Sequence, residues 1–298
     1  MFITLNGLYE PSAIQQLPDG RFLVGEDEKE SPFSLLVIRP DGSTSTERLI
    51  VNAETDDPGK LNDLEGLAID NGGFVYTITS HFRNSKGEEK KSREKLVRFR
   101  VDGNRLVAPR IVHDLKRALT GRHSELAQAA AITDVKANGG LNIEALEFSP
   151  DQQHLMIGFR SPLDAGEALV AVIRNPATMF EPGTAPDVAP ELIRLDLGGH
   201  GLRGMSWIPA LQGYLLISGP VAKEEAHFRL WFWSGQADAK PHCAEAEGLP
   251  GFEHAEGVTP AIIDGKPHIV IVSDDGSRKE GRLARYLLLT PEQIRILP

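Results

Sequence analysis

The chain has 298 residues, of which 41% are hydrophobic and 25% charged, with a formal net charge of -10 and one cysteine. This composition is typical of a globular protein with a sizeable core, whereas the acidity argues against a nucleic-acid partner and the single cysteine excludes an internal disulfide or a multi-cysteine metal site. No apolar stretch reaches the ~20 residues of a membrane span, and residues 1–6 lack the features of a signal peptide, so we expect a cytoplasmic protein with no membrane partner.

Short runs of β-branched, aromatic and leucine residues, separated by Gly, Pro, Asp or Asn, predict β-strands along the whole chain. Turn signals such as Pro18-Asp19-Gly20 separate neighbouring runs. The runs fall into five groups of four. The expected strands are 12–17, 21–24, 34–38 and 45–51; 64–69, 74–79, 95–101 and 106–112; 143–148, 154–159, 168–173 and 191–195; 202–207, 213–217, 228–233 and 241–246; 257–263, 268–272, 284–289 and 293–297.

A short motif opens each group, and its third residue is polar in all five copies. These residues are Ser12, Glu65, Glu144, Arg203 and Glu256. They are separated by 53, 79, 59 and 53 residues, and the two ends of the chain together supply 54 more. A repeat of this size with four strands predicts an all-β, five-bladed β-propeller, closed across the termini as one domain over residues 1–298. Residues 1–5 are expected to pair with the last blade. The alternative, a six-bladed propeller, needs another inner strand, and no sixth motif is present.

One interval between motifs is too long by about half a repeat. The excess contains residues 115–119 and 124–131, which favour helix, with Ser124 as a plausible N-cap. We therefore expect a short helical insertion at 115–138. It either caps the mouth of the central channel or packs on the rim, and the sequence favours neither position.

The propeller topology predicts that polar groups converge on one funnel. The motif residues belong to inner strands, and period-2 alternation would place the residues two positions earlier on the same side. The second strand of each blade returns to the same mouth. The polar residues at the ends of these second strands include Asp27, His81, Arg83, Arg160 and Asp274.

Three glutamates near one axis, Glu65, Glu144 and Glu256, cannot all stay ionised without compensation. Arg203 could fill the carboxylate ring as a salt-bridged plug. The carboxylates could instead bind a hard cation such as Ca²⁺, or share a proton in a ligand or reaction site. The sequence leaves these three arrangements open.

Two functions follow from these arrangements. The first is a small-molecule or cation site in the funnel, such as a cation-assisted hydrolase of a phosphate or ester. In that case His81 or His254 is the acid or base, and arginines such as Arg83 and Arg160 orient a small anionic ligand. Asp27, Arg203 and Asp274 line the same mouth. The second is a non-enzymatic binding propeller whose axis is closed by Arg–Glu pairs. The sequence does not indicate the oligomeric state.

Several segments resemble a bacterial propeller-type domain family of unknown function, from about residue 10 to residue 275. The most specific are Asn-Ile-Glu at 142–144 and Gly-Phe-Arg-Ser-Pro at 158–162; residues 63–68, 195–203 and 218–220 also fit. More distantly, the Glu-Gly motif is similar to esterase-like phytase and gluconolactonase-type propellers. Those relatives imply a divalent cation on the axis, whereas Ser12 and Arg203 depart from an all-acidic ring.

Overall fold

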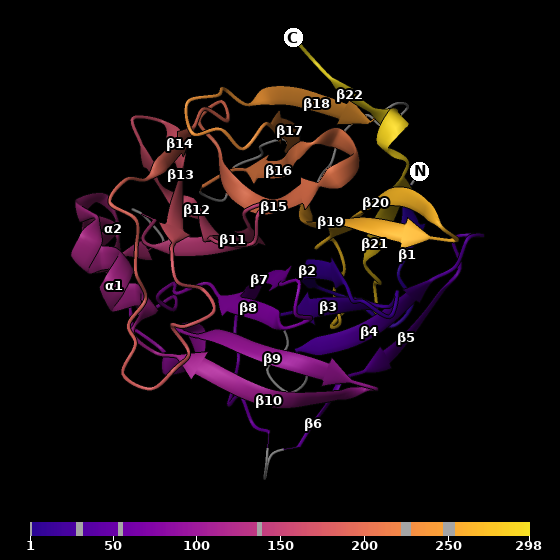
Figure 1. Ribbon diagram of the computed structural model, residues 1–298, viewed down its shortest axis with the longest axis horizontal. Coiled ribbons are helices and arrows are strands. Elements are labelled where there is room, and N and C mark those ends of the chain that lie inside the picture. The colour runs from indigo at the N-terminus through magenta and orange to yellow at the C-terminus, as the bar shows by residue number, and fades with distance from the viewer. Residues whose placement is uncertain (1, 28–31, 53–55, 136–138, 222–227, 247–253) are drawn as a thin grey trace.

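The computed structural model describes residues 2–27, 32–52, 56–135, 139–221, 228–246 and 254–298. They form five sheets arranged around one axis, so the chain is a five-bladed β-propeller (Figure 1). The blades, each given from the axis outward, are β2 (Pro11–Gln16), β3 (Phe22–Glu26), β4 (Phe33–Ile38) and β5 (Thr44–Arg48); β7 (Leu64–Ile69), β8 (Val75–Thr79), β9 (Leu96–Asp102) and β10 (Arg105–Val112); β11 (Asn142–Phe148), β12 (Leu155–Asp164), β13 (Glu167–Ile173) and β14 (Ile193–Leu195); β15 (Gly201–Ile208), β16 (Gly213–Gly219), β17 (Arg229–Trp233) and β18 (His242–Ala246); and β19 (Ala255–Ile263), β20 (Lys266–Ser273) and β21 (Arg285–Leu289).

The two ends of the chain add strands to different blades. β1 (Ile3–Thr4) pairs antiparallel with β21 and becomes the outer strand of the fifth blade, as predicted. β22 (Ile294–Ile296) was expected in that position, but it pairs with β18 of the fourth blade. Because β1 already occupies the edge of β21, the last strand covers the edge that β18 would otherwise leave unpaired. A short strand, β6 (Ile50–Val51), similarly extends β10 in parallel.

The hydrophobic core lies between the blades. Five clusters of buried side chains each join two neighbouring sheets, and the cluster between the fifth and first blades completes the ring. Between the second and third blades, for example, the rings of Tyr76 and Phe148 meet edge to face with centroids 5.0 Å apart. The inner strands are held around the axis by packing on both faces of every sheet, as is usual for the radial arrangement of a propeller.

The insertion forms two helices, α1 (Leu115–Arg122) and α2 (Ser124–Ala131), that lie at the periphery of the disc (Figure 1). Their buried residues join the cluster between the second and third blades, so packing on the rim is the correct alternative. The residue before α2 is His123, and Ser124 contacts Glu125 instead of capping the helix. Residues 136–138 of the expected insertion lie outside the described residues. None of the helices in the described ranges has the length and apolar character needed to cross a bilayer.

Leu119 is fully buried between α1 and the second and third blades. Replacing it with alanine should lower the free energy of unfolding by about 2–5 kcal/mol, because the change removes buried methyl groups and leaves a cavity. Arg117→Ala, on the exposed side of the same helix, should change it by no more than about 0.5 kcal/mol. Urea denaturation of both variants measures the difference. Equal losses would show that α1 does not contribute to the core.

Candidate functional site

Each of the five motif residues occupies a β-bulge. The pairing of the first two strands shifts register around position 12 in the first blade and around positions 65, 144, 203 and 256 in the others. A bulge inserts an extra residue and re-aims its side chain. The simple alternation expected from the sequence therefore breaks at the motif. Asp63 and His254, two positions before it in their blades, also have left-handed backbones, with φ of 62° and 58°.

The residue after each bulge is small because adjacent inner strands approach closely there. A Cβ at Gly204 would lie 1.9 Å from the carbonyl oxygen of Glu256, and a Cβ at Gly66 would lie 2.8 Å from the Cβ of Leu146. Glycine at these positions permits the close backbone approach. The repeated polar-then-small pattern thus has a structural cause: the polar side chain is re-aimed by the bulge, and the small residue lets the next blade fit.

Arg203 bridges two of the three motif glutamates. Its Nη1 lies 2.7 Å from Glu144 Oε2, and its Nη2 pairs with Glu256 Oε1. The three side chains are buried, with 4–9% of each residue exposed. Burial alone would lower the pKa of Arg203, but Glu144 and Glu256 outweigh it and raise that pKa. Arg203 is therefore a permanent cation held between two acids, and this is the plug arrangement that the sequence left open.

Glu144 has two further partners. Arg160 Nη1 lies 3.1 Å from Glu144 Oε1, and the side-chain amide of Asn142 donates to the same oxygen over 2.8 Å. The Nε of Arg160 also donates to the carbonyl oxygen of Pro220 over 2.9 Å. Arg160 therefore belongs to the cluster, as predicted, but two of its nitrogens already have protein partners. Glu144 is the most fully paired of the three glutamates.

Glu65 is the least paired. Within the described part of the chain, no ion pair or hydrogen bond engages its carboxyl group, and the side chain is partly exposed. Loss of hydration and the nearby carboxyl groups of Glu144, Asp63 and Glu256 raise its pKa well above the usual value, against the opposing effect of Arg203. The protonated form of Glu65 is therefore favoured up to a higher pH than in an ordinary glutamate.

Two further carboxyl groups around the Arg203 bridge have raised pKa values. Burial raises the pKa of Glu256 to about 8, although Arg203 opposes the shift. Burial also raises the pKa of Asp274 to about 6; Arg203 again opposes it, while Glu10 and Asp27 add to it. The fifth blade thus contributes two carboxyl groups, of Glu256 and Asp274, that take up or release protons near neutral pH.

The second blade adds Asp63 to the same region. Its carboxyl group pairs with Arg93 Nη1 at 2.8 Å and accepts a hydrogen bond from the Ser80 hydroxyl. Its backbone N–H donates to Asp27 Oδ1 over 2.8 Å, which links the first and second blades. Burial raises the pKa of Asp63 despite these partners. The partners Ser80 and Arg93 carry no repeat signal that could have identified them in the sequence.

Little space remains along the axis beside this cluster. A cavity of about 20 Å³ lies among the five inner strands and is lined by Ser12, Glu65, Glu144 and Glu256 together with neighbouring small and apolar residues. A volume of this size holds about one water molecule. A ligand larger than water must therefore bind at the mouth and not inside the channel.

A second polar layer crosses the inner strands three residues after the motif. Glu147 is buried there and accepts hydrogen bonds from the Ser206 hydroxyl over 2.7 Å and from the backbone N–H of Trp207 over 3.2 Å. Burial raises the pKa of Glu147 to about 7. In the same layer, the Thr259 hydroxyl donates to Gln15 over 3.1 Å. Sequence reasoning missed this layer, although its constant offset from the motif was a usable signal.

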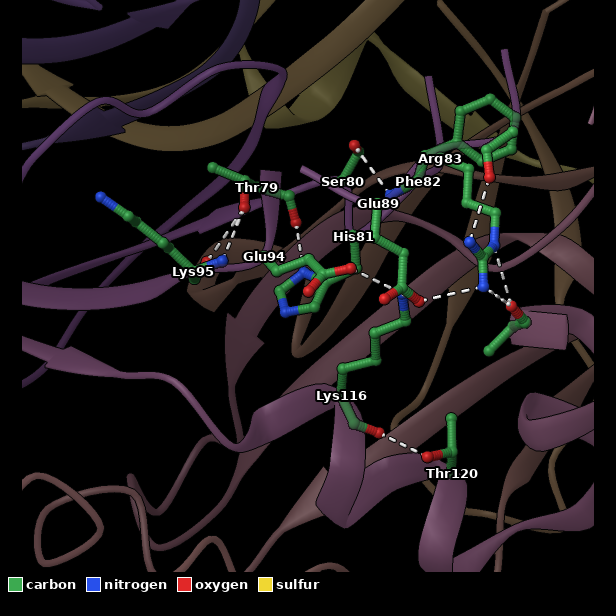
Figure 2. A network of polar contacts seen from close by, with 12 residues as sticks. Thr79, Ser80, His81, Phe82, Arg83, Glu89, Glu94, Lys95, Lys116 and Thr120 are labelled. Atoms are coloured by element: carbon green, nitrogen blue, oxygen red, sulfur yellow. Dashed lines mark hydrogen bonds and ion pairs between the residues drawn. The ribbon is translucent and has the colours of Figure 1, made fainter. Parts of the chain in front are cut away.

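His81 and Arg83 are not part of the carboxylate cluster, contrary to the sequence prediction. The His81 ring is buried, bonds to the carbonyl of Thr79 at 2.8 Å and lies near Lys116 of α1 (Figure 2). Burial lowers the pKa of His81 to about 4. Arg83 donates to the carbonyl of Ala130 in α2 and pairs with Glu89 at 3.0 Å. Arg83 fastens the helical insertion to the second blade, whereas His81, whose backbone has φ of 56°, bonds back to its own strand.

His254 does lie at the mouth, with its ring centroid 5.6 Å from that of Phe228, whose ring also faces the Arg203 guanidinium. The metal site at Glu65, Glu144 and Glu256 stays a prediction. Among the described residues, no group of three His, Cys, Asp or Glu side chains is arranged to hold a metal ion. Arg203 lies between Glu144 and Glu256 and pairs with both, and these are two of the three acids that were expected to bind Ca²⁺.

Comparison with known proteins supports the fold alone. No protein-family model and no curated protein matches the sequence. Among solved structures, a GH43 β-1,3-galactosidase with galactodeoxynojirimycin is 11% identical at a TM-score of 0.51, covering 99% of this chain and 98% of its own. A glucose dehydrogenase-type protein from Thermus thermophilus is 17% identical at a TM-score of 0.46, covering 97% and 99%. The Dos1 propeller is 9% identical at a TM-score of 0.42, covering 97% and 75%. The five sheets around one axis, together with the similarity to the galactosidase, identify this chain as a β-propeller.

Proposed function

We propose that the mouth of the propeller binds a small organic cation, such as an ammonium group, above an axis that is closed by the Arg203 bridge. The observation that carries this proposal is Glu65, a carboxyl group with a raised pKa and no ion-pair partner among the described residues. Ionisable groups with perturbed pKa values that gather in one funnel are associated with functional sites.

The balance of charge favours a cation over the anionic ligand expected from the sequence. Among the described residues, seven carboxyl groups linked by electrostatic interactions lie with three arginines at this mouth, apart from Asp275, which pairs with Arg285. The acids are Glu10, Asp27, Asp63, Glu65, Glu144, Glu256 and Asp274, and the arginines are Arg93, Arg160 and Arg203. Even with Glu65 and Glu256 protonated, five carboxylates remain against three guanidinium groups, so an anion would be repelled.

The carboxyl oxygens at the mouth suit an ammonium group better than a metal ion. An ammonium group donates three hydrogen bonds and needs only a few oxygen acceptors. Glu65 interacts with the carboxyl groups of Asp63 and Glu256, and Asp274 interacts with those of Glu10 and Asp27, so carboxyl oxygens are available around the mouth. A hard cation would need six or more oxygen ligands around it, and among the described residues no group of three His, Cys, Asp or Glu side chains is arranged to hold one.

Thermal unfolding with added ligands tests the proposal. Propylammonium and spermidine should raise the melting temperature, because a ligand at about 100 times its Kd stabilises the folded state by about 2.7 kcal/mol. The shift should increase with pH, because binding a cation favours the ionised form of Glu65. Glu65→Gln should remain folded and lose most of the shift, whereas the surface control Glu280→Gln should keep it. The absence of a shift with either amine, or an unchanged shift in Glu65→Gln, would contradict the proposal.

The second candidate function is the predicted hydrolase of a phosphate or ester. The observation that favours it is His254, an exposed imidazole at the mouth beside groups that exchange protons near neutral pH. Turnover of p-nitrophenyl phosphate and p-nitrophenyl acetate, measured with CaCl₂ and with EDTA, tests this function. Turnover that falls at least about tenfold in His254→Gln would support an acid–base role, which typically contributes a factor of about 10²–10⁴. Amine binding without turnover would support the non-enzymatic propeller.

A further inference from the structure

A second concave site lies on the rim, outside the axial funnel. A cleft of about 450 Å³ separates α1 from the segment 185–188. This segment belongs to the connection between β13 and β14, and Figure 1 shows where α1 and these two strands lie. This volume is within the range of small-molecule sites. We refer to it as the rim cleft. One side is formed by Asp114, Arg117, Ala118, Gly121 and Arg122, and the other by Arg174 and residues 185–188.

Both walls of the rim cleft are fixed by the fold. On one side, Leu115 and Leu119 anchor α1 in the core and leave the positions three, four, seven and eight after Asp114 facing the cleft. On the other, the side chain of Asn175 donates to the carbonyl of Ala185 over 2.9 Å and accepts from the backbone N–H of Asp187 over 2.7 Å. The cleft is therefore formed before any ligand binds, which reduces the entropic cost of binding.

The charge of the rim cleft is opposite to that of the protein. Three arginines and two aspartates line it, an excess of one positive charge in a chain whose net charge is -10. Arg174 pairs with Asp187 at 2.6 Å and Arg117 with Asp114 at 3.0 Å, each through one terminal nitrogen. A guanidinium has five N–H donors, so both retain free donors. No ion pair or hydrogen bond within the described residues engages the exposed Arg122 side chain.

Gly121 keeps the middle of the cleft open. No atom lies within 4 Å of the position that its Cβ would occupy, and its backbone is not in the left-handed region. Neither packing nor backbone conformation therefore requires glycine here, and glycine is an unfavourable residue in a helix. A side chain at this position would project into the cleft. Ala118, Ala185, Pro186 and Val188 complete a lining that is apolar between the arginines.

From this arrangement we propose that the rim cleft binds a small organic anion, in which a phosphate or carboxylate group meets Arg117, Arg122 and Arg174 and an apolar body lies over Gly121. Arginine is suited to this contact because its planar donors match phosphate and carboxylate oxygens. The proposal is independent of the amine site at the propeller mouth, and the two sites differ in the charge that they select.

Calorimetric titration of the full chain with phenyl phosphate, benzoate and inorganic phosphate tests the proposal. Phenyl phosphate should bind in a saturable manner and more tightly than inorganic phosphate, because only the former uses the apolar lining. The ratio between phenyl phosphate and benzoate then identifies the preferred anionic group. Saturable binding of inorganic phosphate alone would reveal a simple anion site and would overturn the proposed organic ligand.

Two variants locate the binding. Arg122→Gln should weaken phenyl phosphate binding about tenfold, the effect of losing one charge-assisted hydrogen bond, and Gly121→Leu should abolish it by filling the cleft. Gly121→Ala provides a smaller obstruction if the leucine variant does not fold. Arg105→Gln, an exposed arginine at the far end of β10, is the matched control and should bind as the unaltered protein does. No saturable binding to the unaltered protein, or equal weakening in Arg105→Gln and Arg122→Gln, would overturn the proposal.

Discussion

Replacing Arg203 with methionine is expected to lower the free energy of unfolding at about pH 8 by roughly 3–5 kcal/mol, the usual cost of removing one partner of a buried ion pair. Arg203 is the cation between Glu144 and Glu256, and methionine would leave both carboxyl groups buried without it. Methionine has a similar length, so the loss would report charge more than volume. Chemical denaturation monitored by circular dichroism measures the change.

The loss should be smaller at about pH 5. Burial raises the pKa of Glu256 to about 8 although Arg203 opposes that shift, so at about pH 5 the group is protonated with or without Arg203, whereas at about pH 8 the unaltered protein holds part of it ionised beside Arg203. A protonated carboxyl needs no counter-charge. Adding Glu256→Gln to Arg203→Met should recover part of the stability at about pH 8. Arg295→Met, which removes an exposed ion pair with Glu245, is the control and should cost less than about 1 kcal/mol. Equal losses for Arg203→Met at both pH values would contradict the account.

The second large effect is on the pH dependence of the unaltered protein. Between about pH 6.5 and 8.5 its stability should fall, because several folded carboxyl groups still hold protons that the unfolded chain has released. Burial raises the pKa of Glu256 to about 8 and that of Glu147 to about 7. The pKa of Glu65 is also raised, by burial and by Glu144. Each such group contributes a slope of up to about 1.4 kcal/mol per pH unit while it titrates.

At lower pH the buried histidine, His81, has the opposite effect on the pH dependence of stability. Burial lowers the pKa of His81 to about 4, so below about pH 6.5 the unfolded chain binds a proton that the folded chain does not. This difference in proton binding at His81 increases the free energy of unfolding as pH rises from about 4 to 6.5. It offsets part of the decrease that the carboxyl groups cause in the same range. One histidine offsets only one of several carboxyl groups, so stability should already fall from about pH 5 and continue to fall to about pH 8. Glu147→Gln should flatten this decrease, and the exposed Glu280→Gln should not. A stability that rises from about pH 6.5 to 8.5 would rule out protonated axial carboxyls.

The repeat made the propeller predictable from the sequence. Ser12, Glu65, Glu144, Arg203 and Glu256 recur because every inner strand has a bulge at the same place, and a small residue must follow so that the next blade can approach. A constraint that acts equally on five blades leaves a periodic signal. It also explains why Arg203 and the glutamates were correctly placed around one axis before their contacts were known.

Features that depend on a single long-range contact left no such signal. The position of β22 depends on which sheet edge remained open after β1 had paired. His81 and Arg83 were assigned to the funnel because they end a second strand, but the left-handed backbone at His81 and the nearby helices direct them to the rim. The Arg93 partner of Asp63 comes from a short 3-10 helix, Lys91–Arg93, in the connection between β8 and β9. The local sequence pattern does not predict which strand β22 pairs with or which contacts His81, Arg83 and Arg93 make.

The central claim is that Arg203 holds Glu144 and Glu256 at the axis, while Glu65, which has no ion-pair partner among the described residues, has a pKa well above the usual glutamate value. The most direct test is an NMR titration of the glutamate side-chain carboxyl carbons, with resonances assigned through Glu65→Gln and Glu256→Gln. We expect Glu256 to titrate with a pKa of about 8 and Glu65 with a pKa well above the usual glutamate value. If both carbons titrated in the ordinary glutamate range, near about 4.3, the carboxyl groups would be solvated and separate, and the proposed axial site would be wrong.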